Sequence, residues 1–483
     1  MTRRFLHENI IAIIDDGISK SVVDDLCFSL TVKNNKIIQN KEPIDISSHG
    51  SICAAIIRKY APYSQLGSIK VLHSKSLKGN RDNLIQAISW CVANGIRIVN
   101  LSIGSVLPQD YFPLLSVINT AAKYGTIIIA AESNDRKITY PACFSNTIGV
   151  VTNPLQKNAE FEYLPALGRG IDFSASSTHL LDMPHGKVHT PNCNSYAAPV
   201  ITALISNFSE SLHFDSIFDV KSMLIENQSS YSYTFDNVLY CLDWLNEIPQ
   251  ICYFTTKEGN KNIGLKNNVK SFEYDSSSFV NNWVSYLDNY SAEQTALGLL
   301  FDSNNELYAN YSWLFSTLHE RSIIPLLLND PQTDIFLDKP VFLPRILQHY
   351  ESRQKKDDIS EIPIILIDQS ISGIFVTDLV KCFFNTGYRA LCFSDEVINQ
   401  LYGHIYWDDR VSFNSCLKLV SDFECDIIIV HKHIEQYKSI VKPDLIITDK
   451  KCLKNSDEDC IIQYCDCEKQ LCNTIINSLT EMR

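Results

Sequence analysis

The chain has 483 residues, enough for about two or three domains, and its 45% apolar and 20% charged residues are typical of a globular protein. No apolar run approaches the about 18 residues that a transmembrane helix needs. The net charge of −13 weakly favours basic substrates, and we expect neither a nucleic acid nor a membrane as a partner.

The first predicted element is a buried parallel strand that ends in an acid. Residues 10–14 are apolar throughout, and Asp15 and Asp16 follow directly, before Gly17. Catalytic groups gather at the carboxyl ends of parallel strands, so a carboxylate at this point is a candidate functional group. Taken alone, the pattern indicates only an aspartate that caps a turn.

A helix that begins at a histidine is predicted next. His49 is followed by Gly50, Ser51 and a run of small and apolar residues. A single histidine at the start of a helix is usually a cap or a surface residue, so His49 becomes a candidate general base only together with suitable partners. The elements predicted after it are strands over 69–72, 98–104 and 126–131 and an amphipathic helix over 84–93.

A candidate nucleophile stands at the start of another helix of small residues. Ser195 follows Cys193 and Asn194, and Tyr196 and an Ala-Ala-Pro sequence come after it. Backbone N–H groups and the positive end of the helix dipole stabilise a developing oxyanion at such a position. The proline is compatible with this helix because it lies in the first turn.

The three segments, in the chain order Asp, His, Ser, resemble the motifs of the subtilisin-like serine peptidases (subtilases) over about residues 8–245. The resemblance implies a three-layer α/β domain with a parallel sheet, in which Ser195 is the nucleophile, His49 the general base and Asp15 the acid that orients the histidine. It also implies that Asn134 donates a hydrogen bond to the oxyanion. The departures from the family pattern are Ser51 for Thr, Ser133 for Gly, Cys193 for Gly, Asn194 for Thr and Tyr196 for Met.

The same resemblance implies where a peptide substrate binds. An extended substrate would pair with the outer part of the strand over 98–104. The residues expected to form one wall of the first specificity pocket are Leu101, Ser102, Ile103 and Gly104. Glu132, Ser133 and Asp135 are expected at its lip, where the two acids would favour Lys or Arg before the scissile bond. The alternative is that both acids are solvated loop carboxylates.

The N-terminus and the cysteines together predict a cytoplasmic protein. The start lacks the apolar stretch of a signal peptide, and the first strand begins too early to leave room for the prodomain that secreted subtilases use to fold. Sixteen cysteines are present, and Cys53, Cys91 and Cys241 stand in apolar surroundings. Such cysteines are expected to be free thiols of the core in a reducing compartment.

No cofactor or metal is expected. Subtilases often bind calcium, but the loops of this chain are short and hold no dense run of Asp and Asn ligands. Zinc is an alternative at the C-terminus, yet no Cys-x2-Cys pair occurs there, so free thiols are the default. The cysteines of this region are Cys452, Cys460, Cys465, Cys467 and Cys472.

The rest of the chain is predicted as a linker and further α/β structure. Two helices, over 218–226 and 237–247, close a peptidase domain set at residues 1–250, and a stretch rich in Lys, Asn, Gly and Ser suggests a linker over 251–280. An accessory α/β segment is set at 281–355, with strands over 296–301 and 323–328 and a helix over 313–321. The C-terminal domain, 356–483, has strands predicted over 361–369, 389–393, 426–430 and 444–447 and a helix over 376–385. This order of elements predicts a Rossmann-like or P-loop-like domain.

The loop after the strand over 361–369 raises the question of a nucleotide site. It holds Ser370, Ser372 and Gly373, but no Gly-Lys-Ser/Thr sequence closes it, and Ile374 stands where a phosphate-binding lysine is needed. The layout is faintly similar to P-loop-like proteins of peptide-maturation gene clusters. We therefore interpret this domain as degenerate and non-hydrolytic, with a function in recognising a substrate or partner.

The leading hypothesis is a cytoplasmic serine endopeptidase of narrow specificity that acts through an acyl-enzyme, for example by removing the leader of a ribosomally made precursor peptide. An unrestrained protease would damage its own cytosol, and the additional domain fits a recognition function. Two alternatives remain open: a catalytically weak scaffold that binds a peptide without cutting it, and a protease of general intracellular protein turnover.

Overall fold

The computed structural model describes residues 10–33, 36–73, 79–164, 170–209, 217–229, 362–395, 399, 403–407, 412–449, 461–464 and 467–481, and the backbone of six short strands between residues 238 and 342. The chain divides into two compact units, Met1–Phe235 and Asp236–Arg483. Within the described residues, no helix has the length and apolar character needed to cross a membrane.

The first unit is built on a nine-stranded sheet with the order β3-β2-β4-β1-β5-β6-β7-β9-β8. Neighbouring strands run parallel, except for the β2–β3 and β8–β9 pairs. The strands are β1 (Ile10–Asp15), β2 (Phe28–Lys33), β3 (Lys36–Gln39), β4 (Gln65–Lys70), β5 (Ile98–Leu101), β6 (Ile127–Ala131), β7 (Ile148–Thr152), β8 (Phe161–Tyr163) and β9 (Phe173–Ala175). This mostly parallel sheet confirms the predicted fold class of the peptidase domain.

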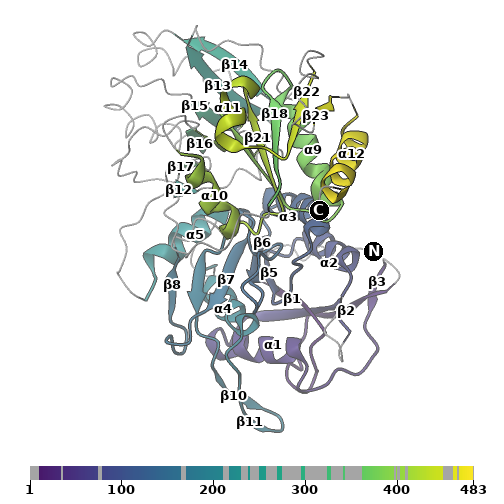
Figure 1. Cartoon of the computed structure of the whole chain (residues 1–483). Helices are drawn as coiled ribbons and strands as arrows, with labels where there is room; N and C mark the ends of the chain where they lie inside the picture. Colours follow the sequence, from purple (N-terminus) through teal and green to yellow (C-terminus); the bar gives the residue numbers. More distant parts are fainter. Residues whose placement is uncertain are drawn as a thin grey trace. The chain divides into compact units, whose positions relative to one another are not determined.

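Helices cover both faces of this sheet (Figure 1). They are α1 (His49–Tyr60), α2 (Arg81–Ala93), α3 (Tyr111–Lys123), α4 (Ala198–Ser209) and α5 (Ile217–Glu226). Helices α2 and α3 pack on each other and share one core cluster with alternate residues of β1, among them Ile10, Ala12 and Ile14. Helices α1 and α4 pack on each other and contact β1 and β5. The first residue of α1 therefore lies beside the carboxyl end of β1. A separate hairpin, β10 (Leu180–Met183) with β11 (Gly186–His189), completes the described sheet structure of this unit.

The second unit contains two six-stranded sheets in which all of the described strand pairs are parallel. The first has the order β12-β17-β16-β15-β13-β14, and the second has the order β20-β19-β21-β18-β22-β23. The strands are β12 (Val238–Leu239), β13 (Gln250–Thr256), β14 (Val269–Tyr274), β15 (Thr295–Leu299), β16 (Ile324–Leu327), β17 (Val341–Phe342), β18 (Ile364–Asp368), β19 (Ala390–Ser394), β20 (Ile405–Tyr406), β21 (Ile427–Lys432), β22 (Leu445–Thr448) and β23 (Ile461–Gln463).

The second of these sheets has a hydrophobic core on each face. Alternate residues of β18 divide between the two cores: Ile365 and Ile367 pack with α9 (Gly373–Asn385) and α12 (Glu468–Glu481), while Leu366 packs with α10 (Phe413–Asp422) and α11 (Ile434–Val441). Side chains alternate across a strand, so this division places the two helix pairs on opposite faces. The strands and the helix predicted for this region are confirmed to within a few residues, but its Rossmann-like or P-loop-like character stays a prediction.

Two predictions for the middle of the chain are corrected. The predicted linker over 251–280 contains strands β13 and β14, which pair with each other. The polar composition of the stretch favours a linker, but Gln250–Thr256 is rich in residues with high β propensity and forms a strand. The helix predicted over 237–247 is wrong at Val238–Leu239, because these residues form strand β12 and pair with β17 of the second unit. This pairing also explains why the units divide at residue 235 rather than at 250. The helix predicted over 313–321 lies outside the described residues.

Candidate active site

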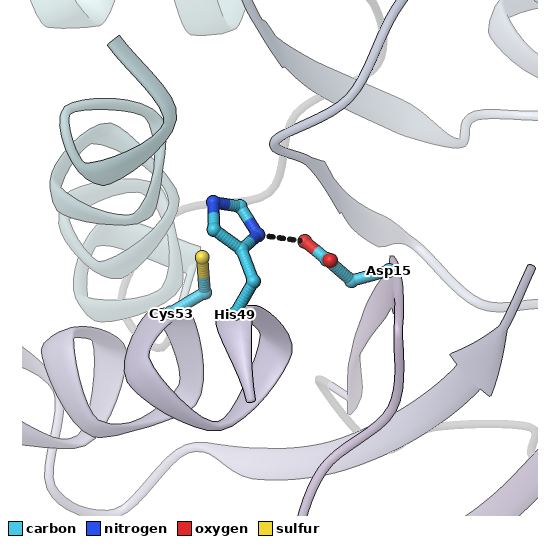
Figure 2. Close-up of side chains that lie close together, drawn as sticks. All are labelled: Asp15, His49 and Cys53. Atoms are coloured by element: carbon cyan, nitrogen blue, oxygen red, sulfur yellow. Dashed lines mark hydrogen bonds and ion pairs between the residues drawn. The ribbon is translucent and has the colours of Figure 1, made fainter. Parts of the chain in front are cut away.

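Strand β1 brings Asp15 to the edge of the sheet. All six residues of the strand are buried, and the Asp15 side chain is 1% exposed. Its Oδ1 accepts a hydrogen bond from the Asp16 backbone N–H at 2.8 Å, and its Oδ2 lies 2.8 Å from Nδ1 of His49 (Figure 2). The chain then turns at Gly17, whose φ of +106° is a conformation that residues with a Cβ rarely adopt.

Helix α1 begins at His49, and two neighbours hold its first turn. Ser48 is the N-cap, with its Oγ accepting from the backbone N–H of Ser51 at 3.3 Å. The carboxylate of Asp16 accepts from the backbone N–H groups of His49 at 3.2 Å and Gly50 at 2.8 Å. A carboxylate is well placed there because these N–H groups have no partner within the helix and carry the positive end of its dipole. Asp16 thus fixes the helix end that carries the histidine.

The electrostatics of the site favour a charged imidazole. Burial of the ring would lower the pKa of His49, but the carboxylates of Asp15 and Asp16 outweigh this effect and raise the pKa above its ordinary value. Burial and the nearby charge of Asp15 also raise the pKa of Asp16, against the hydrogen bonds from Gly50 and His49. An imidazolium that forms by accepting a proton is therefore stabilised at this position.

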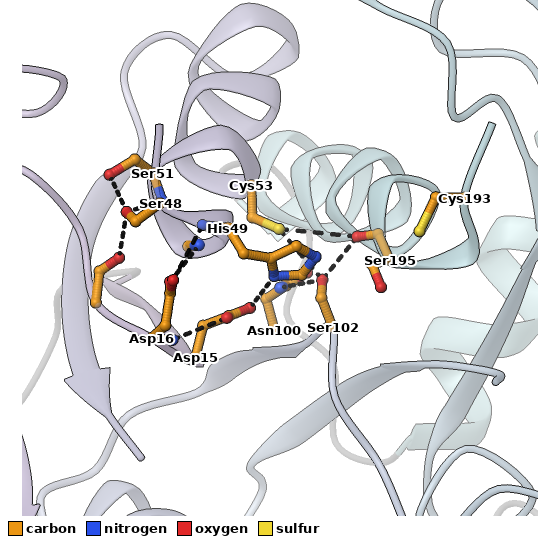
Figure 3. Close-up of polar contacts among 12 residues, drawn as sticks. Asp15, Asp16, Ser48, His49, Ser51, Cys53, Asn100, Ser102, Cys193 and Ser195 are labelled. Carbon is orange, nitrogen blue, oxygen red and sulfur yellow. Dashed lines mark hydrogen bonds and ion pairs between the residues drawn. The ribbon is translucent and has the colours of Figure 1, made fainter. Parts of the chain in front are cut away.

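Ser195 lies on a single 3-10 turn, Asn194–Tyr196, that leads into α4. Its backbone carbonyl accepts a hydrogen bond from Ser102 Oγ at 2.8 Å, and Ser102 Oγ in turn accepts from Asn100 Nδ2 at 3.1 Å (Figure 3). Thr202 Oγ1 on α4 donates to Asn100 Oδ1 at 2.9 Å. These bonds tie the turn that carries the serine to the end of β5.

The hydroxyl of the candidate nucleophile and the second ring nitrogen of His49 have no hydrogen-bond partner among the described residues. Ser195 Oγ and His49 Nε2 make no hydrogen bond to any described residue, and both residues are partly exposed. A hydrogen bond between nucleophile and base is often long or unformed before substrate binds. The structure therefore brings Asp15 and His49 into direct contact and places Ser195 within the same network of residues (Figure 3).

Cys53 and Tyr196 complete the surroundings of the histidine. The ring of Tyr196 lies beside that of His49, with ring centroids 5.3 Å apart. Cys53, one turn further along α1, has its Sγ 3.4 Å from Ser102 Oγ and 3.8 Å from the carbonyl oxygen of Ser195. Sequence reasoning missed the contacts of Asp16, Ser102 and Tyr196, because each joins segments that are far apart in the chain.

Asp15, His49 and Cys53 are also the group of described residues most suited to a metal ion. Their ligand atoms lie within 4.8 Å of one another (Figure 2). Metal binding requires a thiolate, but burial raises the pKa of Cys53 well above its ordinary value. Because Asp15 also holds Nδ1 of the histidine in a hydrogen bond, the arrangement suits proton transfer better than metal binding. Of the C-terminal cysteines, Cys452, Cys460 and Cys465 lie outside the described residues.

Asn134 lies against the segment that precedes the candidate nucleophile. Its Oδ1 accepts from the backbone N–H of Asn194 at 3.0 Å, and its Nδ2 donates to Sγ of Cys193 at 3.4 Å. The Asn194 side chain makes the reverse connection, donating from Nδ2 to the carbonyl oxygen of Ser133 at 2.9 Å. The loop after β6 is thus joined to the Ser195 turn, and a function of Asn134 at the oxyanion stays a prediction.

The predicted pocket residues divide into two groups. Leu101 is fully buried in the core, and Ser102 is buried under Ser195, so their side chains do not form the expected wall. Ile103 is half-buried and Gly104 exposed, so only these two of the four can form a wall open to solvent. At the predicted lip, Glu132 is buried, Ser133 is half-buried and Asp135 is exposed. The neighbouring Arg136 and Lys137 are exposed as well, so the loop carries charges of both signs.

In the loop after β18, which was considered as a nucleotide site, the serines make local hydrogen bonds. Ser370 donates from Oγ to Asp368 Oδ1 at 3.0 Å. Ser372 is the N-cap of α9, where its Oγ accepts from the backbone N–H of Phe375 at 3.2 Å. Gly373 is required by packing, because a Cβ there would lie 2.1 Å from Asn399 Oδ1. These contacts explain the Ser-x-Ser-Gly sequence without a bound phosphate.

Comparison with known proteins shows what the N-terminal part of the chain is similar to. Residues 7–228 match the model of the subtilase family. The minor extracellular protease Epr of Bacillus subtilis (strain 168) is 31% identical over 183 residues, which are 35% of this chain and 27% of that protein. Subtilisin Savinase of Lederbergia lenta is 27% identical over 204 residues, which are 39% of this chain and 71% of that protein.

Among solved structures, the nisin leader peptidase NisP from Lactococcus lactis is similar, with 17% identity, a TM-score of 0.38 and coverage of 50% of this chain and 89% of that one. The chain spans 27% of the length of Epr and 52% of that of the M-protease of Shouchella clausii (strain KSM-K16). The sequence match itself extends over the nine-stranded sheet and over all of the residues that meet around His49. Residues 7–228 are thus similar to the subtilase family of serine peptidases.

Proposed function

We propose that this chain is a serine endopeptidase that cleaves peptide bonds through an acyl-enzyme. The observation that carries the proposal is the 2.8 Å bond between Asp15 and His49, next to a serine at the start of α4 in a subtilase domain. Asp15 holds Nδ1 of the ring, so Nε2 is the nitrogen that takes the proton of Ser195 Oγ as this oxygen attacks the carbonyl carbon. His49 then passes the proton to the leaving amine, and water releases the acyl group in a second step.

The oxyanion of each tetrahedral intermediate would be held by two donors. One is the backbone N–H of Ser195 at the entrance to α4, and the other is Nδ2 of Asn134. Support for the second donor comes from the hydrogen bond between Asn134 Oδ1 and the backbone N–H of Asn194, which ties Asn134 to the residue before the nucleophile. Loss of one such donor typically costs about 3 kcal/mol of transition-state stabilisation.

We propose further that the substrate is a precursor peptide from which a leader segment is removed inside the cell. The support is the second unit, which contains two parallel sheets. Hydrolysis of an arbitrary peptide does not require such a unit. Recognition by such a unit would restrict cleavage to few substrates. The preference for Lys or Arg before the scissile bond stays a prediction, and it now rests on the exposed Asp135 alone.

Digestion of defined substrates tests this function. The full chain and its Ser195→Ala variant would be incubated with precursor peptides that carry N-terminal leaders and, in parallel, with casein. Mass spectrometry should show one dominant cut at a leader boundary with the wild type, no cut with the variant, and intact casein. Free digestion of casein without selective leader cleavage would instead support general protein turnover.

A peptide-binding scaffold is the second candidate. The contact between Asn134 Nδ2 and Cys193 Sγ favours it, since this contact engages the amide that hydrolysis needs. A folded wild-type protein that binds a peptide in calorimetry but releases no product over hours would support the scaffold and contradict the peptidase.

A further inference from the structure

The orientation of the Asn134 amide is fixed by chemistry. The backbone N–H of Asn194 is a donor, so the side-chain atom 3.0 Å from it must be the oxygen of Asn134. The two ends of an amide look alike in many structures, but this partner leaves one assignment. The NH₂ group therefore faces the other way, toward Sγ of Cys193 at 3.4 Å.

Cys193 has a backbone conformation that does not depend on which side chain the residue carries. Its φ of −154° and ψ of 135° are extended values that any residue adopts, so glycine is not required for the turn to form. The residue is partly exposed and precedes Ser195 by two positions. What cysteine adds at this point is a sulfur atom on the NH₂ group of Asn134.

We propose that Cys193 gates the oxyanion hole, an inference that rests on the proposed peptidase function. In the structure the thiol takes the hydrogen bond that Asn134 would give to the substrate's oxyanion. The sulfur must turn away from the amide before a tetrahedral intermediate can use it. A thiol is a weak acceptor, so breaking the bond between Asn134 Nδ2 and the sulfur requires little free energy. This free energy adds to the barrier of the chemical step and not to peptide binding.

A series of side chains at position 193 tests the gate. Cys193→Gly removes the sulfur and should raise kcat between about twofold and tenfold with KM nearly unchanged, because a neutral hydrogen bond has a small net free energy. Cys193→Ala should give part of this gain. Cys193→Val places a branched group in the same space and should lower kcat, with melting temperatures measured to confirm that each variant is folded.

A double-mutant cycle with Asn134→Ala shows whether the effect passes through the amide. The gain of Cys193→Gly should disappear in the Asn134→Ala background, and a gain that persists there would overturn the gate. The same acylation rates can be measured with a fluorophosphonate probe. Equal rates for wild type and Cys193→Gly would also overturn the gate while leaving the peptidase function intact. Folded proteins that both fail to react would overturn the peptidase function and, with it, the gate.

Discussion

At the scale of single residues, Asp16 distinguishes this site most clearly. It binds the first two N–H groups of α1 and adds a second carboxylate next to the one that orients His49. Both charges raise the pKa of His49. His49 accepts a proton only when it is neutral, so activity should be lost as the pH falls through this pKa.

Asp16→Asn should move the acid limb of the kcat/KM profile to lower pH. The variant removes one negative charge near the imidazole, so the pKa of His49 falls. Activity at neutral pH should also decrease, because an amide holds the helix N-terminus less strongly than a carboxylate. Asp25→Asn is the matched control, since Asp25 is exposed and pairs with Arg58. An acid limb that stays in place in Asp16→Asn would contradict this explanation.

Sequence patterns could identify the candidate catalytic residues but not the contacts that surround them. Asp15, His49 and Ser195 each stand in a local motif at the end or the start of an element. Asp16 looks like a mere neighbour in the sequence, because its partners lie 33 and 34 positions away. Ser102 was assigned to the pocket wall, yet its hydroxyl bonds the backbone of a residue 93 positions away. Such contacts depend on how β1, β5, α1 and α4 meet, and no local pattern encodes that.

At the scale of elements, the fit of α1 against the turn after β1 positions Asp15 and His49 next to each other. Gly50 makes this fit possible, because a Cβ there would lie 2.6 Å from the carbonyl oxygen of Gly17 and 3.2 Å from Cβ of Asp15. These atoms belong to backbone and to a buried side chain, so they cannot move aside without shifting the helix or the strand.

Gly50→Ala should therefore impair stability and activity together. Overpacking of this kind costs about 1–3 kcal/mol in the free energy of unfolding. The displacement of α1 should also lengthen the bond between Asp15 and His49 and reduce kcat by at least about tenfold. Chemical denaturation and steady-state kinetics measure the two effects. Unchanged kcat in the folded variant would show that the site tolerates movement of α1.

The sequence and burial of each strand explain which elements could be predicted. Strands β1, β6, β18 and β21 are apolar runs buried in parallel sheets, and their sequences stand out for this reason. Strand β12 has two residues and owes its existence to pairing with β17, about a hundred positions later. A strand that forms mainly because of its partner has no clear strand pattern in its own sequence.

At the scale of the whole molecule, about half of the cysteines that the structure describes are core residues. Eleven cysteines lie among the described residues, and six of these are buried. Burial raises the pKa of Cys91, Cys392 and Cys416, which keeps their thiols protonated and unreactive in the folded state.

Reductant should therefore leave the melting temperature unchanged. A thiol reagent such as dithionitrobenzoate should react quickly with exposed cysteines, among them Cys27, and with the buried ones only after unfolding in guanidinium. A melting temperature that falls in dithiothreitol would point to a disulfide and contradict the expectation of free thiols.

Labelling with a fluorophosphonate measures whether Asp15 and His49 activate Ser195. The reagent phosphonylates a serine only when a base and an oxyanion hole are in place. The purified full chain should be labelled on Ser195, and Ser195→Ala and His49→Ala should not react although both remain folded. Absence of labelling on the folded wild type, or equal labelling of Ser195→Ala, would contradict this activation.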